Sequence, residues 1–413
     1  MKRAHIAFIS FPHPPHVNPT LPIASVLIRR GHRVSYVTSN KFESRVGRLG
    51  AEFVRSPEFL PKEPLELADK DRLEWPVCRL AVRTLAQIVP LYERDRPDLI
   101  IYDFMALAGR VLAHKLNIPA VRTSPTFALC RQNWEQQVKD PEYRRVAIEA
   151  SSLADRFLQR YGVVSNDFLF HRENLNIYLF PKVLQPDGDV FDESCLYAGR
   201  CAAEQPYYGD WQKSASGDRP IVLVSTSTTY EQGPEFFKMC IEALSGLGCH
   251  VLLSIGDGGN AATLEPLPDH VEIVQYTSHV KILPYVDAFI CLPGIITASE
   301  ATYHGVPLVV TSLGFPEEEW EGDNFERLGI AIHLRKAAMN VEAVKLAAIR
   351  ALEDPGMRNR VKEIQRIVQR EPGGEETVNS IEAYLEAYLL RGASKTGFES
   401  THSTVGGGSR RRR

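Results

Sequence analysis

Residues 6–37 decide the fold, and their sequence is IAFISFPHPPHVNPTLPIASVLIRRGHRVSYV. The apolar run 6–11 predicts a buried strand, the apolar spacing over 21–30 predicts a helix, and residues 33–37 predict a second strand. Gly31 suits the end of the helix, because glycine adopts the left-handed conformation in which many helices terminate. A strand, a helix and a strand in this order are typical of a parallel sheet covered by helices.

The same alternation continues along the chain. Strands predicted at 99–102 and 120–123 enclose a helix over 107–115, and a second series begins with a strand at 221–225 and a helix over 234–247. Further strands are predicted at 251–255, 271–274, 288–291 and 308–310. The two series predict an α/β protein with two Rossmann-like, doubly wound parallel-sheet domains that face a central cleft.

The length supports two domains, because 413 residues exceed what one hydrophobic core usually holds and fit two units of about 200 residues. A segment rich in Gly, Pro, Ser and Tyr separates the two series and predicts a linker. The polar C-terminal segment ends in four arginines and predicts disorder. We therefore expect an N-terminal domain over 1–205, a linker over 206–220, a C-terminal domain over 221–376, a terminal helix over 377–393 and a disordered tail over 394–413.

The composition is that of a globular protein, with 44% hydrophobic and 24% charged residues. A net charge of −3 gives no reason to expect nucleic acid as a partner, and no apolar run approaches the roughly 20 residues of a membrane span. Pro12 interrupts the first apolar run, so a signal peptide is not expected. Seven cysteines without CxxC spacing indicate reduced thiols and a cytoplasmic location. A homodimer is compatible with the sequence.

Two residues suited to acid–base chemistry follow predicted strands. His16 comes after the first strand and Asp103 directly follows the strand at 99–102, so both are expected at the edge where ligands bind such sheets. An imidazole held by a carboxylate is a competent base near neutral pH. The alternative is that each residue caps the helix after it. His13 and His16 make a poor metal pair, because Pro14 and Pro15 break any helix and no third ligand is evident, so no metal site is predicted.

The segment 11–21, FPHPPHVNPTL, resembles the HGHVNP(S/T)L loop of macrolide- and flavonoid-type glycosyltransferases. The resemblance includes the pattern LxxRGHxVxYVT over 27–38, the segment PDLIIYD over 97–103 and the segment 181–186, and it covers nearly the whole chain. It implies the GT-B fold, in which the first domain mainly binds the acceptor and the second binds the nucleotide sugar. It also implies that His16 deprotonates the acceptor hydroxyl and that Asp103 orients the imidazole.

The donor motif departs from the family pattern HAGxGGSxE. Residues 292–300 are LPGIITASE, which keep Gly294 and Glu300, the position that contacts the ribose in the family. The His, the two glycines and the Ser of the pattern are replaced by Leu292, Ile296, Thr297 and Ala298. A leucine donates no hydrogen bond to a phosphate, and a branched side chain hinders its close approach to the backbone.

Other donor segments are also altered. The Ser-x-Gly-Ser turn at 225–228 loses its glycine, the Trp-x-Pro-Gln segment keeps only an aromatic ring at 276, and the Asp-Gln pair is matched by two glutamates. If each lost charged contact costs about 1.5–3 kcal/mol, several together weaken binding by roughly a thousandfold or more. Compensation by Thr228, Thr297 and His279 is the alternative. The candidate donor-binding residues are Thr228, Tyr276, Gly294, Thr297, Glu300, Glu317 and Glu318.

The acceptor is expected in an apolar pocket of the first domain, lined by Phe11, Trp75, Phe104, Met105 and Phe127. Each residue alone is more typical of core, but together they favour a hydrophobic, polyketide- or macrolide-like ligand. The favoured function is transfer of a sugar, with inversion, from a UDP- or dTDP-sugar co-substrate to a hydroxyl of such a molecule, with no other cofactor. One alternative is a GT-B enzyme that has lost nucleotide-sugar binding and uses the dyad for elimination, cyclisation or rearrangement of a natural product. The other is a non-catalytic partner of a glycosyltransferase.

Overall fold

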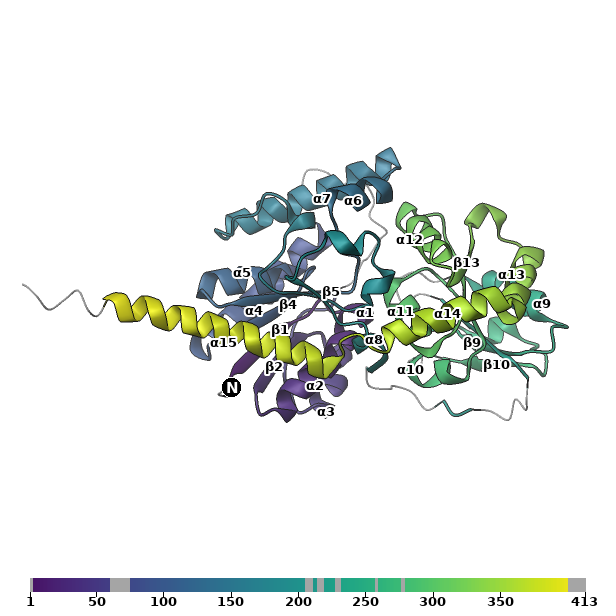
Figure 1. Ribbon diagram of the computed structural model, residues 1–413, viewed down its shortest axis with the longest axis horizontal. Helices are drawn as coiled ribbons and strands as arrows, with labels where there is room; N and C mark the ends of the chain where they lie inside the picture. The colour runs from purple at the N-terminus through teal and green to yellow at the C-terminus, as the bar shows by residue number, and fades with distance from the viewer. Residues whose placement is uncertain are drawn as a thin grey trace, which may run out of the picture.

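The computed structural model describes residues 3–59, 75–204, 211–213, 219–226, 232–256, 259–275 and 279–399, with side chains up to Arg391. It contains two parallel sheets, one in each half of the chain, each covered by helices on both faces (Figure 1). The predicted α/β class and the two Rossmann-like domains are confirmed.

The first sheet has seven strands in the order β3-β2-β1-β4-β5-β6-β7, all paired in parallel. The chain starts in the centre of this sheet, builds outward to β3, and then returns to place β4 on the other side of β1. The neighbours β1 and β4 therefore flank the point at which the strand order reverses, where ligands bind in such sheets. The strands are β1 (His5–Ile9), β2 (Arg33–Thr38), β3 (Glu52–Arg55), β4 (Leu99–Asp103), β5 (Ala120–Ser124), β6 (Asn176–Tyr178) and β7 (Cys195–Tyr197).

The second sheet repeats this arrangement with six strands in the order β10-β9-β8-β11-β12-β13. Its reversal point lies between β8 and β11, so the segments after these two strands occupy the corresponding position in the second domain. The strands are β8 (Ile221–Ser225), β9 (His250–Ser254), β10 (Val271–Val274), β11 (Ala288–Cys291), β12 (Leu308–Thr311) and β13 (Ala331–Leu334).

Alternate residues of the first sheet enter different cores, because successive side chains of a strand point to opposite faces. Ile6 and Phe8 pack under α2 (Leu21–Arg29) and α3 (Glu43–Arg48), whereas Ala7 and Ile9 pack under α4 (Pro76–Arg94) and α5 (Leu107–Leu116). The other helices of this half are α1 (Pro14–Val17), α6 (Arg131–Gln137), α7 (Pro141–Arg160) and α8 (Cys201–Glu204). Those of the second half are α9 (Pro234–Leu244), α10 (His279–Ile282), α11 (Ile295–His304), α12 (Pro316–Arg327), α13 (Val341–Glu353) and α14 (Pro355–Val368).

The last helix, α15 (Gly374–Glu399), returns to the first domain and packs beside α2 (Figure 1). Val378, Ile381 and Leu385 are buried there in the same core as Ile6 and Phe8. At its edge, Glu382 accepts hydrogen bonds at 2.7 Å from Arg30 Nη1 and at 3.0 Å from the His32 ring. The buried apolar stripe therefore holds the helix, and the ion pairs set its register.

Several boundaries differ from those predicted. The first strand ends at Ile9 instead of residue 11, and the helix predicted over 234–247 ends at Leu244, before Gly246 with its φ of +81°. The terminal helix extends to Glu399, beyond residue 393. The strands β3, β6, β7 and β13 were not predicted. Much of the proposed linker and residues 400–413 lie outside the described residues, so those boundaries stay predictions.

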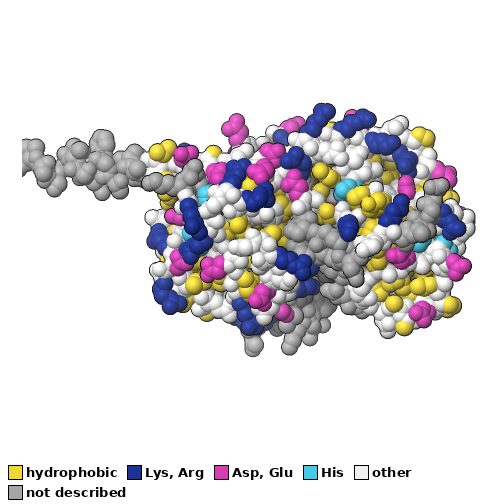
Figure 2. Space-filling model, turned by 90° about the horizontal axis from the view of Figure 1, so that it is seen from below, with side chains coloured by type: hydrophobic (Ala, Val, Ile, Leu, Met, Phe, Trp, Pro, Cys, Tyr) yellow, Lys and Arg dark blue, Asp and Glu magenta, His cyan; other side chains and the backbone are white. Residues whose placement is uncertain are grey.

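The surface carries both signs of charge, and Lys or Arg side chains are interspersed with Asp and Glu over the face shown in Figure 2. Among the described residues, no helix is long and apolar enough to span a bilayer.

Candidate active site

His16 lies in the single turn α1, directly after the first strand. Pro14 and Pro15 begin this turn, where their fixed φ angles suit a helical conformation and their missing N–H groups cost no hydrogen bond. The backbone N–H of His16 donates to the carbonyl of His13 at 3.0 Å, which closes the turn. The two prolines thus hold His16 in a short helical turn at the carboxyl edge of the sheet.

His16 and Asp103 meet as predicted, with His16 Nδ1 at 2.8 Å from Asp103 Oδ2. The carboxylate is 1% exposed and the imidazole 13% exposed, so the pair is shielded from bulk water without being closed to a ligand. Nδ1 donates its proton to the carboxylate, which leaves the lone pair on Nε2 as the basic site. Among the described residues, no hydrogen bond is recorded for Nε2.

The helix-cap alternative is wrong for both residues, because α2 and α5 have Thr20 and Ala106 at their N-caps and neither helix has a side-chain cap hydrogen bond. Asp103 Oδ1 accepts a hydrogen bond from the N–H of Met105 at 2.9 Å, which shapes the turn before α5. The other oxygen binds the imidazole, and the His16 ring makes no hydrogen bond to the start of α2. Asp103 therefore anchors its own loop and orients His16 at the same time.

Aromatic rings enclose the imidazole. Phe104 stacks on it with a centroid distance of 5.9 Å and an interplanar angle of 19°, and Phe11 lies at 5.1 Å. His13 lies at 6.1 Å, and burial together with the neighbouring His16 lowers the pKa of His13 to about 4. His13 is therefore neutral at neutral pH. Within the described part of the chain, no three His, Cys, Asp or Glu residues are arranged to hold a metal ion.

The five predicted acceptor residues border two different hollows. Phe11 and Met105 line one of about 280 Å³ that also includes residues of α4, whereas Phe104 and Phe127 line another of about 340 Å³. Trp75 borders neither, and its ring packs edge-on against Phe168 at 6.1 Å. Phe127 also contacts Trp320 of α12 at 5.0 Å, so it links the first domain to the second. The roles of these residues as ligand contacts stay predictions.

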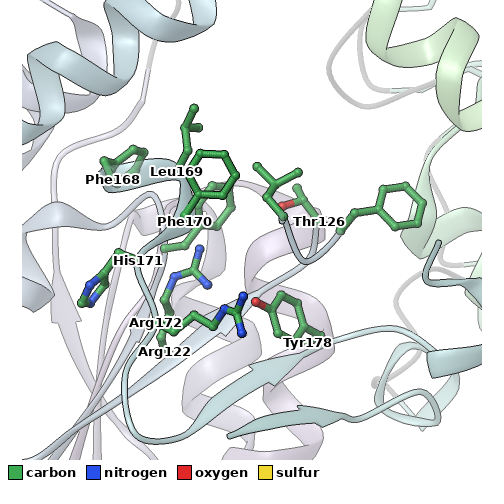
Figure 3. Close-up of a pocket in the computed structure, with 11 residues that line it drawn as sticks. Arg122, Thr126, Phe168, Leu169, Phe170, His171, Arg172 and Tyr178 are labelled. Carbon is green, nitrogen blue, oxygen red and sulfur yellow. The ribbon is translucent and has the colours of Figure 1, made fainter. Parts of the chain in front are cut away.

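The second hollow contains residues that the sequence did not single out, above all Arg122, Arg172 and Tyr178 (Figure 3). Arg122 and Tyr178 lie on β5 and β6, next to each other in the sheet. Arg122 and Tyr178 are close because β5 pairs with β6. Since β6 has only three residues, its sequence pattern does not reveal it as a strand, and the sequence therefore provides no indication that these side chains meet.

The donor-type segment begins α11 after β11, at the reversal point of the second sheet. Leu292 is buried, and Gly294 precedes the helix in an extended conformation. Ile296, at a position where the family has a glycine, is half-buried and packs against the cores of both domains. Its side chain therefore takes part in the domain interface. Thr297 is half-buried in the first turn of the same helix.

Glu300 contacts His279, which the sequence suggested only as compensation for the altered donor motif. The Nδ1 atom of His279 lies 3.3 Å from Glu300 Oε2, and its Nε2 atom lies 3.3 Å from Ser225 Oγ at the end of β8. These contacts link the segments after β8 and β11 with α10. Thr228 and Tyr276 lie outside the described residues, so their predicted roles are not addressed by the structure.

The two candidate glutamates of α12 have different environments. Glu317 Oε2 accepts a hydrogen bond at 3.1 Å from the hydroxyl of Tyr143, which lies on α7 of the first domain. Glu318 Oε2 accepts from the N–H of Leu313 at 2.7 Å and is 7% exposed. Burial raises the pKa of the Glu318 carboxyl, and of Glu321 on the next turn of the helix. Glu318 thus holds the loop before its own helix, whereas Glu317 contacts the opposite domain.

Comparison with known proteins agrees with this geometry. Residues 127–373 match the family model described as UDP-glucoronosyl and UDP-glucosyl transferase. The chain is 32% identical to the NDP-glycosyltransferase YjiC of Bacillus subtilis (94% of this chain and 98% of that protein), and 29% identical to the oleandomycin glycosyltransferase of Streptomyces antibioticus (93% and 91%). Its structure resembles that of CalG4, the calicheamicin glycosyltransferase, with a TM-score of 0.80, 29% identity and coverage of 94% and 99%. The protein therefore belongs to the UDP-glucoronosyl and UDP-glucosyl transferase family and has the GT-B fold.

Proposed function

We propose that this protein transfers a sugar from a UDP- or dTDP-sugar to a hydroxyl group of a hydrophobic small molecule, with His16 as the general base. The observation that carries the proposal is the 2.8 Å contact between His16 Nδ1 and Asp103 Oδ2 at the reversal point of the first sheet. The relatives named for oleandomycin and calicheamicin support a natural product as the acceptor.

The proposed reaction is a direct displacement. The acceptor hydroxyl donates its proton to His16 Nε2 while its oxygen bonds to the anomeric carbon of the sugar. The bond from that carbon to the phosphate oxygen breaks, and the nucleoside diphosphate leaves with the electron pair. Attack from the face opposite the leaving group inverts the anomeric configuration. Asp103 stabilises the imidazolium that forms, because a buried carboxylate next to a positive charge is favourable.

The walls of the site suit an apolar acceptor. Phe11 and Phe104 cover the imidazole, and the hollow of about 280 Å³ beside it has a mainly aliphatic and aromatic lining. On the donor side, we propose that Gly294, Thr297, Glu300 and Glu317 contact the nucleotide sugar. His279 could compensate for the missing histidine of the family motif, since it lies between Ser225 and Glu300.

A second candidate function follows from the donor segment. Leu292 and Ile296 offer no hydrogen bonds to a diphosphate, and Ile296 is committed to the domain interface. These observations favour a protein that keeps the dyad for elimination, cyclisation or rearrangement of a natural product without a nucleotide sugar.

One experiment separates the two functions. The purified protein is incubated with UDP-glucose or dTDP-glucose and a panel of hydroxylated macrolides and polyketides, and products are analysed by mass spectrometry. A mass gain of one hexose that His16→Ala lowers by roughly 10²–10⁴-fold supports sugar transfer. Conversion of an acceptor without nucleotide sugar supports the second function, and undiminished sugar transfer by His16→Ala removes His16 from the mechanism.

A matched control comes from a second His–carboxylate pair in the chain. His250 Nε2 lies 3.2 Å from Glu272 Oε2, where β9 begins, at the sheet edge opposite the site. His250→Ala removes a comparable pair without touching the site, and we expect its activity to match that of the unmodified protein.

A further inference from the structure

The hollow of about 340 Å³ combines an apolar wall with two cationic side chains. Figure 3 shows Arg122 and Arg172 pointing into it near Tyr178, with Phe168 and Phe170 on the far side. Its lining residues are Phe104, Arg122, Thr126, Phe127, Leu129, Phe168, Leu169, Phe170, His171, Arg172 and Tyr178. Neutral hydrophobic ligands give no reason for two guanidiniums in one small hollow.

Neither Arg122 nor Arg172 forms a salt bridge within the described residues, although the exposed carboxyl of Asp192 lies near enough for the charge of Arg172 to contribute to its lowered pKa. Arg122 is only 7% exposed, and its guanidinium lies beside Tyr178 and over the face of Phe104, 5.4 Å from the ring centroid. Arg172 lies over the ring of Phe191 at 5.1 Å. A guanidinium on an aromatic face keeps its N–H groups available at the edge. Burying such a charge without an ion-pair partner is costly, so a bound anion would stabilise this arrangement.

The third basic residue of the hollow, His171, already has hydrogen-bond partners at both ring nitrogens. His171 Nδ1 lies 3.0 Å from Arg110 Nη2, and His171 Nε2 lies 3.1 Å from Glu173 Oε1. Glu173 also accepts a hydrogen bond from the Tyr102 hydroxyl at 2.7 Å. This carboxylate therefore belongs to a separate network and does not neutralise the arginines. Arg122 and Arg172 are therefore the cationic side chains of the hollow that have N–H donors to offer to a ligand.

The hollow adjoins the proposed base through one side chain. Phe104 contacts the Arg122 guanidinium at 5.4 Å and stacks on the His16 imidazole at 5.9 Å. A ligand whose anionic end lies at Arg122 can therefore extend along Phe104 and bring a more distant hydroxyl to His16 Nε2. The spacing suits an elongated molecule with a charged group at one end and a hydroxyl at the other.

We propose that the acceptor carries a carboxylate, which Arg122 and Arg172 bind while its apolar body lies against Phe104, Phe168 and Phe170. Guanidinium groups pair with the planar carboxylate through parallel hydrogen bonds, and the aromatic wall suits an aryl or alkenyl chain. The two arginines select the acceptor and orient it. This inference rests on the proposed function only in assigning the bound molecule as the sugar acceptor.

The test compares 4-hydroxycinnamate with its methyl ester, which has the same ring and hydroxyl but no charge. By calorimetry, we expect the acid to bind about tenfold to a hundredfold more tightly, as charged hydrogen bonds predict. Arg172→Gln and Arg122→Gln should remove this preference and leave the affinity for the ester nearly unchanged. Arg131→Gln is the control, because Arg131 is exposed at the start of α6, outside the lining of the hollow. It should keep the preference.

Each other outcome decides against the inference. Equal affinities for acid and ester, or an undiminished preference in Arg172→Gln, would overturn it. Inorganic phosphate that displaces the acid more strongly than acetate does would assign the site to phosphate or sulfate esters. If Arg122→Gln fails to fold, Arg122→Lys is used instead, because it retains the charge but loses the paired N–H donors of the guanidinium. This variant should bind the acid more weakly and leave the affinity for the ester unchanged. Sugar transfer to the neutral ester is assayed separately, so its failure would reject the proposed function while the binding preference still supports the anion site.

Discussion

Replacing Asp103 by Asn exchanges one carboxylate oxygen for an NH₂ group and removes the negative charge next to the proposed base, His16. In the unmodified protein, the N–H of Met105 donates to Asp103 Oδ1 at 2.9 Å. The amide oxygen of Asn can still accept this hydrogen bond, so the loop should keep its shape. The amide NH₂ then faces His16 Nδ1, which must accept instead of donate, and the ring proton moves to Nε2. Loss of the charged contact at 2.8 Å costs about 1.5–3 kcal/mol, or roughly 10–150-fold in rate, and the wrong tautomer raises the loss toward about 10⁴-fold.

The assay is steady-state sugar transfer across a pH series, with thermal unfolding measured on the same samples. We expect kcat to fall and its pH profile to change, while acceptor affinity and unfolding temperature stay nearly constant. Glu272→Gln, in the pair with His250, supplies the control and should leave kcat unaltered. The reasoning is refuted if Asp103→Asn turns over at the normal rate, and a variant that merely unfolds would assign Asp103 to holding the loop before α5.

Three further predictions concern other parts of the molecule. UDP and dTDP should bind with dissociation constants near the millimolar range, because Leu292, Ile296 and Ala298 replace donors and a glycine at one phosphate site; calorimetry that gives micromolar values would contradict this. Burial raises the pKa of Glu371 to about 7, although the N–H of Lys182 donates to it at 2.9 Å, so the folded state prefers the protonated carboxyl. Its contribution to stability is complete below about pH 4.5 and is lost as pH rises through about 7, by about 3 kcal/mol; urea unfolding at pH 5 and 8 should show this decrease, and Glu371→Gln should abolish it. Finally, a double-mutant cycle of Phe127→Ala and Trp320→Ala should give a coupling of about 0.5–1.5 kcal/mol, whereas strictly additive losses would mean that the 5.0 Å ring contact adds nothing to the domain interface.

The sequence predicted what depends on chain order and apolar periodicity. The long buried strands such as β1 and β4 were recognisable, and with them the positions of His16 and Asp103 at the reversal point. Residues that meet only through tertiary packing were not predictable. Arg122 gave no signal because its neighbour Tyr178 lies on a three-residue strand, and the contact of Ile296 with both cores needs the relative position of the domains. The contact between His16 and Asp103 was therefore predictable from the sequence, but the position of the two arginines in one hollow was not.

The return of α15 to the first domain means that the chain crosses between the domains twice, once before β8 and again between α14 and α15. Two covalent connections therefore join the domains. Because α15 completes the core of the first domain, that domain needs a segment from the end of the chain. Residues 1–205 expressed alone would leave uncovered the surface that Val378, Ile381 and Leu385 bury, so this half should be soluble only when α15 is supplied, either fused to it or added as a peptide.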